Sequence, residues 1–264
     1  MSTKRVSIGA GELNVVDQGS GMPLLLVHGF PLDHTMWRRQ IDALSDVCRV
    51  IVPDQRGFGQ SGAVESLSME GMADDLAALL DALGVAEPMV YCGLSMGGYI
   101  AWQFVKRHGD RLAKLILCDT RAAADSEEAR KNRYATAEKV LEQGSAVVAA
   151  GMLPKLFADS TVAQQPDIVE QTKQVIENTA PTTVAAALHA MAARIDATSM
   201  LPDVAVATLL VCGEHDALTP AAEMRQIAAA MPSAQYVEIA DAGHMAPLEK
   251  PQPVNDAIRS FLAD

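Results

Sequence analysis

The chain has 264 residues, of which 49% are hydrophobic, and this composition excludes a disordered or fibrous protein and allows one large buried core. Its 21 lysines and arginines against 33 acidic residues give a formal net charge of -12, which repels nucleic acid phosphates and anionic membrane surfaces. We therefore expect neither a nucleic acid nor a membrane as a partner.

The first residues contain no apolar segment of the kind found in signal peptides, and no stretch approaches the roughly 20 apolar residues of a membrane helix. We therefore expect a soluble, cytoplasmic protein. The cysteines lie in or beside apolar runs and form no zinc-type pairs. We expect reduced core cysteines and neither a metal site nor a cofactor; the four positions are Cys48, Cys92, Cys118 and Cys212.

The N-terminal segment predicts a hairpin with strands over 6–8 and 12–17 and a turn over 9–11. After it, short continuous apolar runs alternate with helical patterns, which is typical of a parallel sheet covered on both faces. We predict an α/β fold with a doubly wound, mostly parallel eight-stranded sheet, whose later strands lie near 24–27, 49–52, 89–92, 115–118, 209–212 and 236–239.

The runs at 115–118 and 209–212 lie about 90 residues apart, far more than one crossover helix needs. Helical patterns separated by glycines and prolines fill this gap. We predict a helical cap over 121–197, inserted after the sixth strand, on a core formed by 1–120 and 198–264. Apolar side chains of the cap either line an adaptable pocket or, as the better explanation, serve ordinary packing: Met152, Leu153, Leu156, Phe157, Leu188 and Met191.

The segment 88–98 predicts a buried strand that ends in a nucleophile, Ser95. Glycines two residues before and after Ser95 let the backbone turn sharply into a helix, so that the hydroxyl is exposed at the carboxyl edge of the sheet. The amphipathic helix that follows favours this interpretation over a glycine-rich surface turn. Free N–H groups at the helix start, including that of Met96, point where negative charge develops on an attacked carbonyl oxygen.

A serine hydroxyl becomes a good nucleophile only with a base and a carboxylate that orients the base. His244, in a loop after the strand near 236–239, is our candidate base. Asp216 precedes it by one strand-helix-strand step, and we assign it the role of the acid. Asp119 also follows a predicted strand and competes for that role; otherwise it begins the cap linker or bonds to the backbone there.

The remaining histidines have other predicted roles. His28 directly follows a strand and fits the shaping of an oxyanion loop, in which Phe30 gives a second N–H beside that of Met96. His215 adjoins Asp216 but points away from it in an extended loop. We expect the others to be surface or structural residues: His34, His108 and His189.

The segment 57–62 matches the glycine pattern of a dinucleotide-binding loop. A phosphate-binding loop must open directly into a helix, whereas a further segment intervenes here before a helix predicted at 69–83. We interpret 54–61 as a structural loop in which Asp54 and Arg56 hydrogen-bond across the sheet edge.

Taken together, these motifs resemble those of the α/β-hydrolase superfamily over nearly the whole chain: His28-Gly-Phe30, Asp54-x-Arg-Gly-x-Gly-x-Ser61, Gly93-Leu-Ser-Met-Gly-Gly98, Gly213-x-x-Asp216 and Gly243-His244. The chain is also similar to small bacterial carboxylesterases and 3-oxoadipate enol-lactonases, notably in Met36-Trp37 and Cys118-Asp-Thr120. Epoxide hydrolases and haloalkane dehalogenases of the superfamily use an aspartate nucleophile, so Ser95 argues against both.

The resemblance implies that His244 takes the proton of Ser95, which attacks an ester or lactone carbonyl. Asp216 then orients the imidazole, and the Phe30 and Met96 amides hold the oxyanion. The expected partner is a small-molecule ester or lactone. Carbon-carbon bond hydrolases, thioesterases, amidases and perhydrolases use the same triad and stay open, as do a non-catalytic receptor or signalling protein and a nucleotide-binding oxidoreductase. The acyl-chain preference and the oligomeric state also stay open.

Overall fold

The structure, a computed structural model, describes residues 2–9 and 11–264. Its strands form one eight-stranded sheet in the order β1-β2-β4-β3-β5-β6-β7-β8. The pairs β1–β2 and β2–β4 are antiparallel and all other pairs are parallel, which confirms the predicted fold class. The strands are β1 (Thr3–Ser7), β2 (Glu12–Gly19), β3 (Met22–Val27), β4 (Cys48–Pro53), β5 (Met89–Leu94), β6 (Leu112–Cys118), β7 (Ala207–Gly213) and β8 (Ala234–Ile239).

The central strands are the most deeply buried part of the sheet. All six residues of β5 are buried, and so are five of the six residues of β3. Burial on both faces explains why these strands are continuous apolar runs in the sequence. The N-terminal hairpin is also present, although its predicted turn over 9–11 includes residue 10, which lies outside the described residues.

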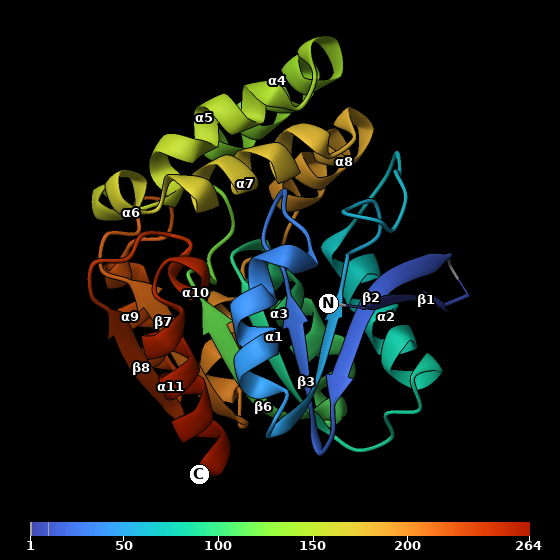
Figure 1. The fold of residues 1–264 in the computed structure, drawn as a ribbon, viewed down its shortest axis with the longest axis vertical. Helices are drawn as coiled ribbons and strands as arrows, with labels where there is room; N and C mark the ends of the chain where they lie inside the picture. The colour runs from blue at the N-terminus through green and yellow to red at the C-terminus, as the bar shows by residue number, and fades with distance from the viewer. Residues whose placement is uncertain (1, 10) are drawn as a thin grey trace.

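Helices cover both faces of this sheet (Figure 1). The helices α1 and α11 pack together on one face, and α2 and α3 pack together on the other. The helix α9 contacts β7 and β8. The helices of the core are α1 (Arg38–Leu44), α2 (Met69–Ala82), α3 (Met96–His108), α9 (Ala221–Ala230), α10 (Ala246–Glu249) and α11 (Pro251–Ala263).

The loop over 54–61 is structural, as predicted, but Arg56 does not bond across the sheet edge. Its guanidinium binds the carboxylate of Asp75 in α2, with Nε 2.8 Å from Oδ2. Asp54 accepts hydrogen bonds from Asn14 of β2, at 2.9 Å, and from the amide and ring of His34. The prediction for Arg56 was wrong because a buried carboxylate on a neighbouring helix is not visible in the local sequence.

A group of helices between β6 and β7 forms the upper layer in Figure 1, above the carboxyl edge of the sheet. At its base the two chain segments meet, since the amide of Ala197 donates to the carbonyl of Ala122 at 2.9 Å. This contact lies at the predicted cap boundary; the division into a core and a cap stays a prediction. The helices are α4 (Glu127–Gln143), α5 (Ala146–Leu156), α6 (Asp159–Gln164), α7 (Pro166–Asn178) and α8 (Pro181–Ala192).

A buried ion pair stabilises the same base. Asp125 binds Arg194 at 2.7 Å and Arg133 at 2.5 Å, and the Arg194 guanidinium lies 4.3 Å from the ring centre of Tyr99 in α3. A cation stacked on an aromatic ring adds to the attraction that the carboxylate supplies. The cap is thereby anchored to the helix that follows Ser95.

All four cysteines are free and buried. Among the described residues, no helix combines the length and the hydropathy that crossing a membrane would require.

Candidate active site

Ser95 lies on a sharp turn between β5 and α3. Its backbone has φ 53° and ψ -110°, a left-handed conformation that is rare outside glycine and marks stored strain. The surroundings hold it in place, because the Ser95 amide donates to the carbonyl of Cys118 at 3.0 Å. The hydroxyl of Thr120 donates to the carbonyl of Ser95 at 2.7 Å.

The glycines two residues before and after Ser95, Gly93 and Gly97, occupy positions where no larger residue fits. A β carbon on Gly93 would lie 2.5 Å from the backbone of Gly97, and one on Gly97 would lie 2.4 Å from the carbonyl oxygen of Val27. Both neighbours are backbone atoms, which cannot move aside as a flexible side chain can. The close approach of α3 to β3 and β5 therefore requires glycine at both positions.

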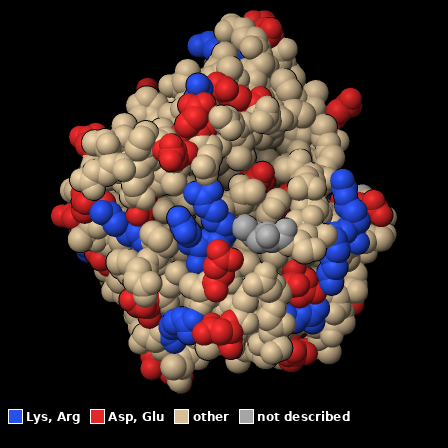
Figure 2. All heavy atoms as spheres, in the orientation of Figure 1, with Lys and Arg blue, Asp and Glu red and all other residues tan. Residues whose placement is uncertain are grey.

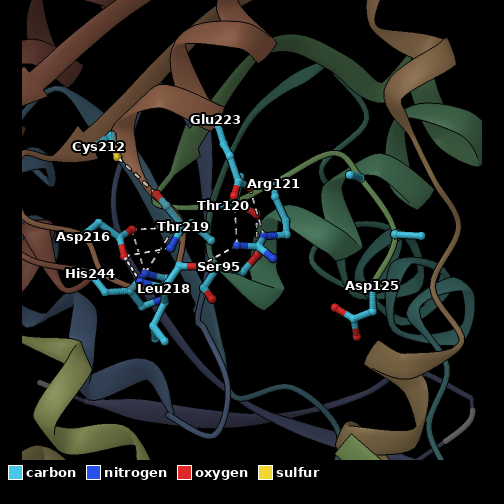
Figure 3. Close-up of polar contacts among 12 residues, drawn as sticks. Ser95, Thr120, Arg121, Asp125, Cys212, Asp216, Leu218, Thr219, Glu223 and His244 are labelled. Carbon is cyan, nitrogen blue, oxygen red and sulfur yellow. Dashed lines mark hydrogen bonds and ion pairs between the residues drawn. The ribbon is translucent and has the colours of Figure 1, made fainter. Parts of the chain in front are cut away.

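His244 and Asp216 form a buried hydrogen-bonded pair at the carboxyl ends of β8 and β7 (Figure 3). The distance from His244 Nδ1 to Asp216 Oδ2 is 2.9 Å, and the two residues are only 2% and 5% exposed. The hydroxyl of Thr219 donates to the same oxygen at 2.5 Å. Because Nδ1 faces a carboxylate, it carries the proton, which leaves Nε2 free to accept another.

Further donors hold the Asp216 carboxylate in its ionised form. The amides of Leu218 and Thr219 donate to Oδ1 at 2.8 and 2.9 Å. Burial by itself raises the pKa of Asp216, but the nearby His244 and these hydrogen bonds outweigh it, so that the pKa lies below its ordinary value. Asp216 is therefore suited to orient an imidazole and to stabilise it when it becomes positively charged.

One cavity of about 540 Å³ connects the residues predicted from the sequence. Ser95, His244 and Phe30 all line it, below helices of the cap. In the described part of the chain, no hydrogen bond joins the side chains of Ser95 and His244. Hydrogen bonds between a nucleophile and its base are often long before a substrate binds, so this absence does not exclude such a pair.

Of the two backbone positions predicted for an oxyanion hole, Phe30 lines the cavity, and Met96 directly follows Ser95. Met96 is the first residue of α3, where the N–H groups lack acceptors within the helix. Phe30 lies on the loop after β3, which His28 shapes: its Nδ1 binds the carbonyl of Gly29 at 2.9 Å, and its Nε2 accepts from the amide of Gln55 at 3.0 Å. Both ring nitrogens of His28 are therefore occupied, which excludes it as the base.

Asp119, the competing acid candidate, lies beside the pair but does not bind His244. It is fully buried, and its Oδ1 accepts from the amide of Gly213 at 2.8 Å. Its Oδ2 has no hydrogen-bond partner among the described residues. Burial and the charge of Asp216 raise the pKa of Asp119 well above its ordinary value. The neutral form of this carboxyl group is therefore favoured, and Asp119 bonds to the backbone, one of the two roles predicted for it.

The other histidines lie away from the reactive centre. The exposed ring of His215 lies 3.9 Å from Glu214 and does not bind Asp216. His34 binds the buried carboxylate of Asp54 at 2.7 Å, and His108 binds Asp74 at 2.8 Å. These are structural contacts.

The cavity lining differs in charge from the whole chain. It includes four basic side chains and one carboxylate, whereas acidic residues predominate in the sequence. On the face in Figure 2, coloured acidic and basic side chains alternate, so charge of one sign does not cover that face continuously. The charged lining residues are Arg121, Arg133, Lys139, Lys155 and Asp125.

Of the apolar cap residues proposed as lining, Met152, Leu188 and Met191 line the cavity.

Sequence reasoning missed two residues that hold the candidate acid and the candidate base in place. Thr219 binds Asp216, and the spacing Asp216-x-x-Thr219 is a signal that could have found it, because an aspartate often accepts amides two or three residues later. Glu249 binds the backbone on both sides of His244. No local pattern points to it.

Two groups of side chains have donor atoms within 4.8 Å of one another, as a metal ion requires: Asp33, His34 and Asp54, and Asp119, Cys212 and Asp216. In both groups, hydrogen bonds within the protein already occupy most of the donor atoms, so neither makes an open metal site.

Comparison with known proteins places this site in context. A solved structure of a thermophilic esterase from Thermogutta terrifontis, described as malate bound, is 46% identical with a TM-score of 0.95, covering 100% of this chain and 98% of that chain. 3-Oxoadipate enol-lactonase 1 of Acinetobacter baylyi is 28% identical over 87% of this chain and 84% of its own length. Epoxide hydrolase 3 of Xenopus tropicalis is 31% identical over 91% of this chain and 71% of its own length.

The profile of one protein family, described as the alpha/beta hydrolase fold, matches residues 22–251, which include Ser95, Asp216 and His244. With this match and these relatives, the chain belongs to the alpha/beta hydrolase fold family.

Proposed function

We propose that this protein is a serine hydrolase that cleaves small carboxylic esters or lactones through an acyl-enzyme intermediate. One observation carries the proposal: His244, which is hydrogen-bonded to Asp216, lines the same cavity as Ser95, and Ser95 lies on a strained turn before a helix N-terminus. A nucleophile and a base in one cavity, with an acid that orients the base from behind, are the parts that acyl transfer needs.

The proposed reaction uses each group in turn. His244 Nε2 takes the Ser95 proton while Oγ bonds to the carbonyl carbon, and the Met96 and Phe30 amides hold the resulting oxyanion. The intermediate collapses, and the alcohol leaves with the proton from His244. Water then attacks the acyl-serine, giving a proton to His244, and the acid is released as Ser95 regains its hydrogen.

The relatives support an ester or lactone as the substrate class. These relatives include an esterase and an enol-lactonase. They also include an epoxide hydrolase, whose name indicates a different reaction. A serine hydroxyl, and not a carboxylate, occupies the nucleophile turn here, which favours acyl transfer over epoxide opening.

Replacing Ser95 tests the proposal. We expect the Ser95→Ala variant to keep its fold and its Tm but to hydrolyse p-nitrophenyl acetate at least about 10³-fold more slowly. A fluorophosphonate probe should label the unaltered protein at Ser95 and leave the variant unlabelled, as mass spectrometry would show. Near-normal turnover by the variant would overturn the proposal. Turnover of a panel of esters, lactones, thioesters and diketones then separates the reactions that share this triad.

A further inference from the structure

Glu249 is a buried carboxylate whose role the proposed reaction does not explain. It is the last residue of α10 and only 2% exposed. Its Oε1 accepts from the amide of Gly243 at 2.9 Å and from the amide of Met245 at 3.2 Å, the residues immediately before and after His244. The carboxylate therefore fastens the backbone of the loop that carries the imidazole.

The other carboxylate oxygen binds the cap. Glu249 Oε2 accepts from the amide of Ala158 at 2.8 Å, in the short link between α5 and α6. The histidine loop touches this link directly as well, because the amide of Met245 also donates to the carbonyl of Leu156 at 3.1 Å. A β carbon on Gly243 would lie 2.7 Å from the Ala158 nitrogen, so the two backbones are in close contact.

We propose that Glu249 is a positioning residue that joins the loop of His244 to the cap segment 156–158, at the end of α5 and in the link to α6, so that the position of the cap on the core sets the position of the imidazole relative to Ser95. This inference rests on the proposed function. It matters for the reaction because Ser95 and His244 share a cavity without a hydrogen bond between them. A displacement of about 1 Å in a reacting group is enough to cost a large factor in rate.

The chemistry of the three donors explains why a carboxylate is needed. Among the described residues, three backbone N–H groups donate to the Glu249 side chain, and both of its oxygens accept. A glutamine has nearly the same shape but only one oxygen, so its NH₂ group must face either the cap amide or the loop amides. The Glu249→Gln variant therefore releases one side of the connection while it keeps the volume of the side chain.

The test compares Glu249→Gln with Ile258→Val, a variant of a fully buried residue in α11 that lies outside both segments and should lower the stability of the same C-terminal region. We expect kcat for p-nitrophenyl acetate to fall about 10- to 100-fold in Glu249→Gln, with KM within about threefold. In Ile258→Val only Tm should fall. A kcat in Glu249→Gln within about twofold of that of the unaltered protein would overturn the inference.

A second measurement uses the unaltered protein, in case Glu249→Gln does not fold. Amide hydrogen exchange of residues 158, 243 and 245 should slow together when a fluorophosphonate occupies Ser95; unchanged exchange at residue 158 would overturn the inference. The same reagent separates the two proposals. If it fails to label the unaltered protein, the proposed function is wrong; if it labels Glu249→Gln as fast as the unaltered protein, only the role of Glu249 is wrong.

Discussion

Asp119 and Asp216 have carboxyl oxygens within 4.8 Å of each other at the ends of the neighbouring strands β6 and β7. Their surroundings push their pKa values in opposite directions: burial and Asp216 raise that of Asp119, while His244 and hydrogen bonds lower that of Asp216 against the effect of burial. Their surroundings thereby favour the neutral form of Asp119 and the ionised form of Asp216.

This division predicts different results for two matched substitutions. Asp216→Asn removes the charge that orients His244, and we expect kcat to fall on the order of 10³- to 10⁴-fold. Asp119→Asn mimics the neutral carboxyl group and can still accept from the Gly213 amide, so kcat should stay within about twofold. Steady-state kinetics on p-nitrophenyl acetate checks both. The reverse ranking would make Asp119 the acid.

The pH dependence of stability gives a second prediction for Asp119. Because its pKa is higher in the folded protein than in the unfolded chain, the folded state holds the extra proton between the two values. Unfolding then releases this proton, so the free energy of unfolding falls as the pH rises above the unfolded pKa of about 4, by at most about 1.4 kcal/mol per pH unit.

Asparagine cannot ionise, so Asp119→Asn should gain stability relative to the unaltered protein as the pH rises from about 4 towards 7. The opposite contribution of Asp216 is present in both proteins and cancels. Urea unfolding at several pH values measures the difference. A constant difference across this range would mean that Asp119 is already ionised in the folded protein.

The strands could be predicted because a strand buried on both faces is a continuous apolar run in the sequence. The residues at which they begin and end could not be predicted. We predicted the sixth strand near 115–118, whereas β6 begins at Leu112 and includes Lys114. The Lys114 ammonium leaves the sheet to donate to the carbonyl of Phe261 at 2.7 Å and lies 5.0 Å from the centre of its ring. The sequence therefore did not show that Lys114 belongs to the strand, because its partner lies far along the chain in α11.

The candidate site likewise contains residues that the sequence could indicate and residues that it could not. Ser95, Asp216 and His244 could be selected from the sequence because each follows an apolar run and the carboxyl ends of parallel strands share one edge. Glu249 could not, because its cap partner, Ala158, is 91 residues away. Contacts between the core and an inserted segment depend on how the segment folds back, which local periodicity does not encode.

The glycines around Ser95 allow a prediction about stability. In Gly97→Ala the new β carbon would meet the Val27 carbonyl oxygen at 2.4 Å, so α3 must move away from β3. We expect the free energy of unfolding to fall by about 1–3 kcal/mol or more, and the esterase rate to fall with it. Denaturant unfolding and kinetics measure the two effects.

Gly109, at the other end of α3, is the matched control. A β carbon there meets nothing within 4 Å, and the backbone is right-handed with φ -62°. Gly109→Ala should therefore be neutral or stabilise the protein by up to about 1 kcal/mol. Equal effects of the two substitutions would mean that the approach of α3 to β3 is not tight.

The charged lining of the cavity predicts a preference for esters that carry a carboxylate. Arg133 is paired with Asp125, and Arg121 lies 3.3 Å from Glu223, whereas Lys139 and Lys155 have no carboxylate partner among the described residues. These two exposed lysines can attract an anionic substrate, and the solvated, salt-screened character of such charges keeps their effect modest.

Replacing both lysines by alanine should raise KM for p-nitrophenyl hemisuccinate about two- to tenfold at low salt, with KM for p-nitrophenyl acetate unchanged. Lys131 is the matched control, because it lies on α4 as Lys139 does, but it pairs with Glu127 at 2.9 Å and does not line the cavity. Lys131→Ala should leave both KM values alone. Because solvent ions screen exposed charges, the effect of the double substitution should shrink as salt rises to 0.5 M; a salt-independent change would point to lost packing instead of lost charge.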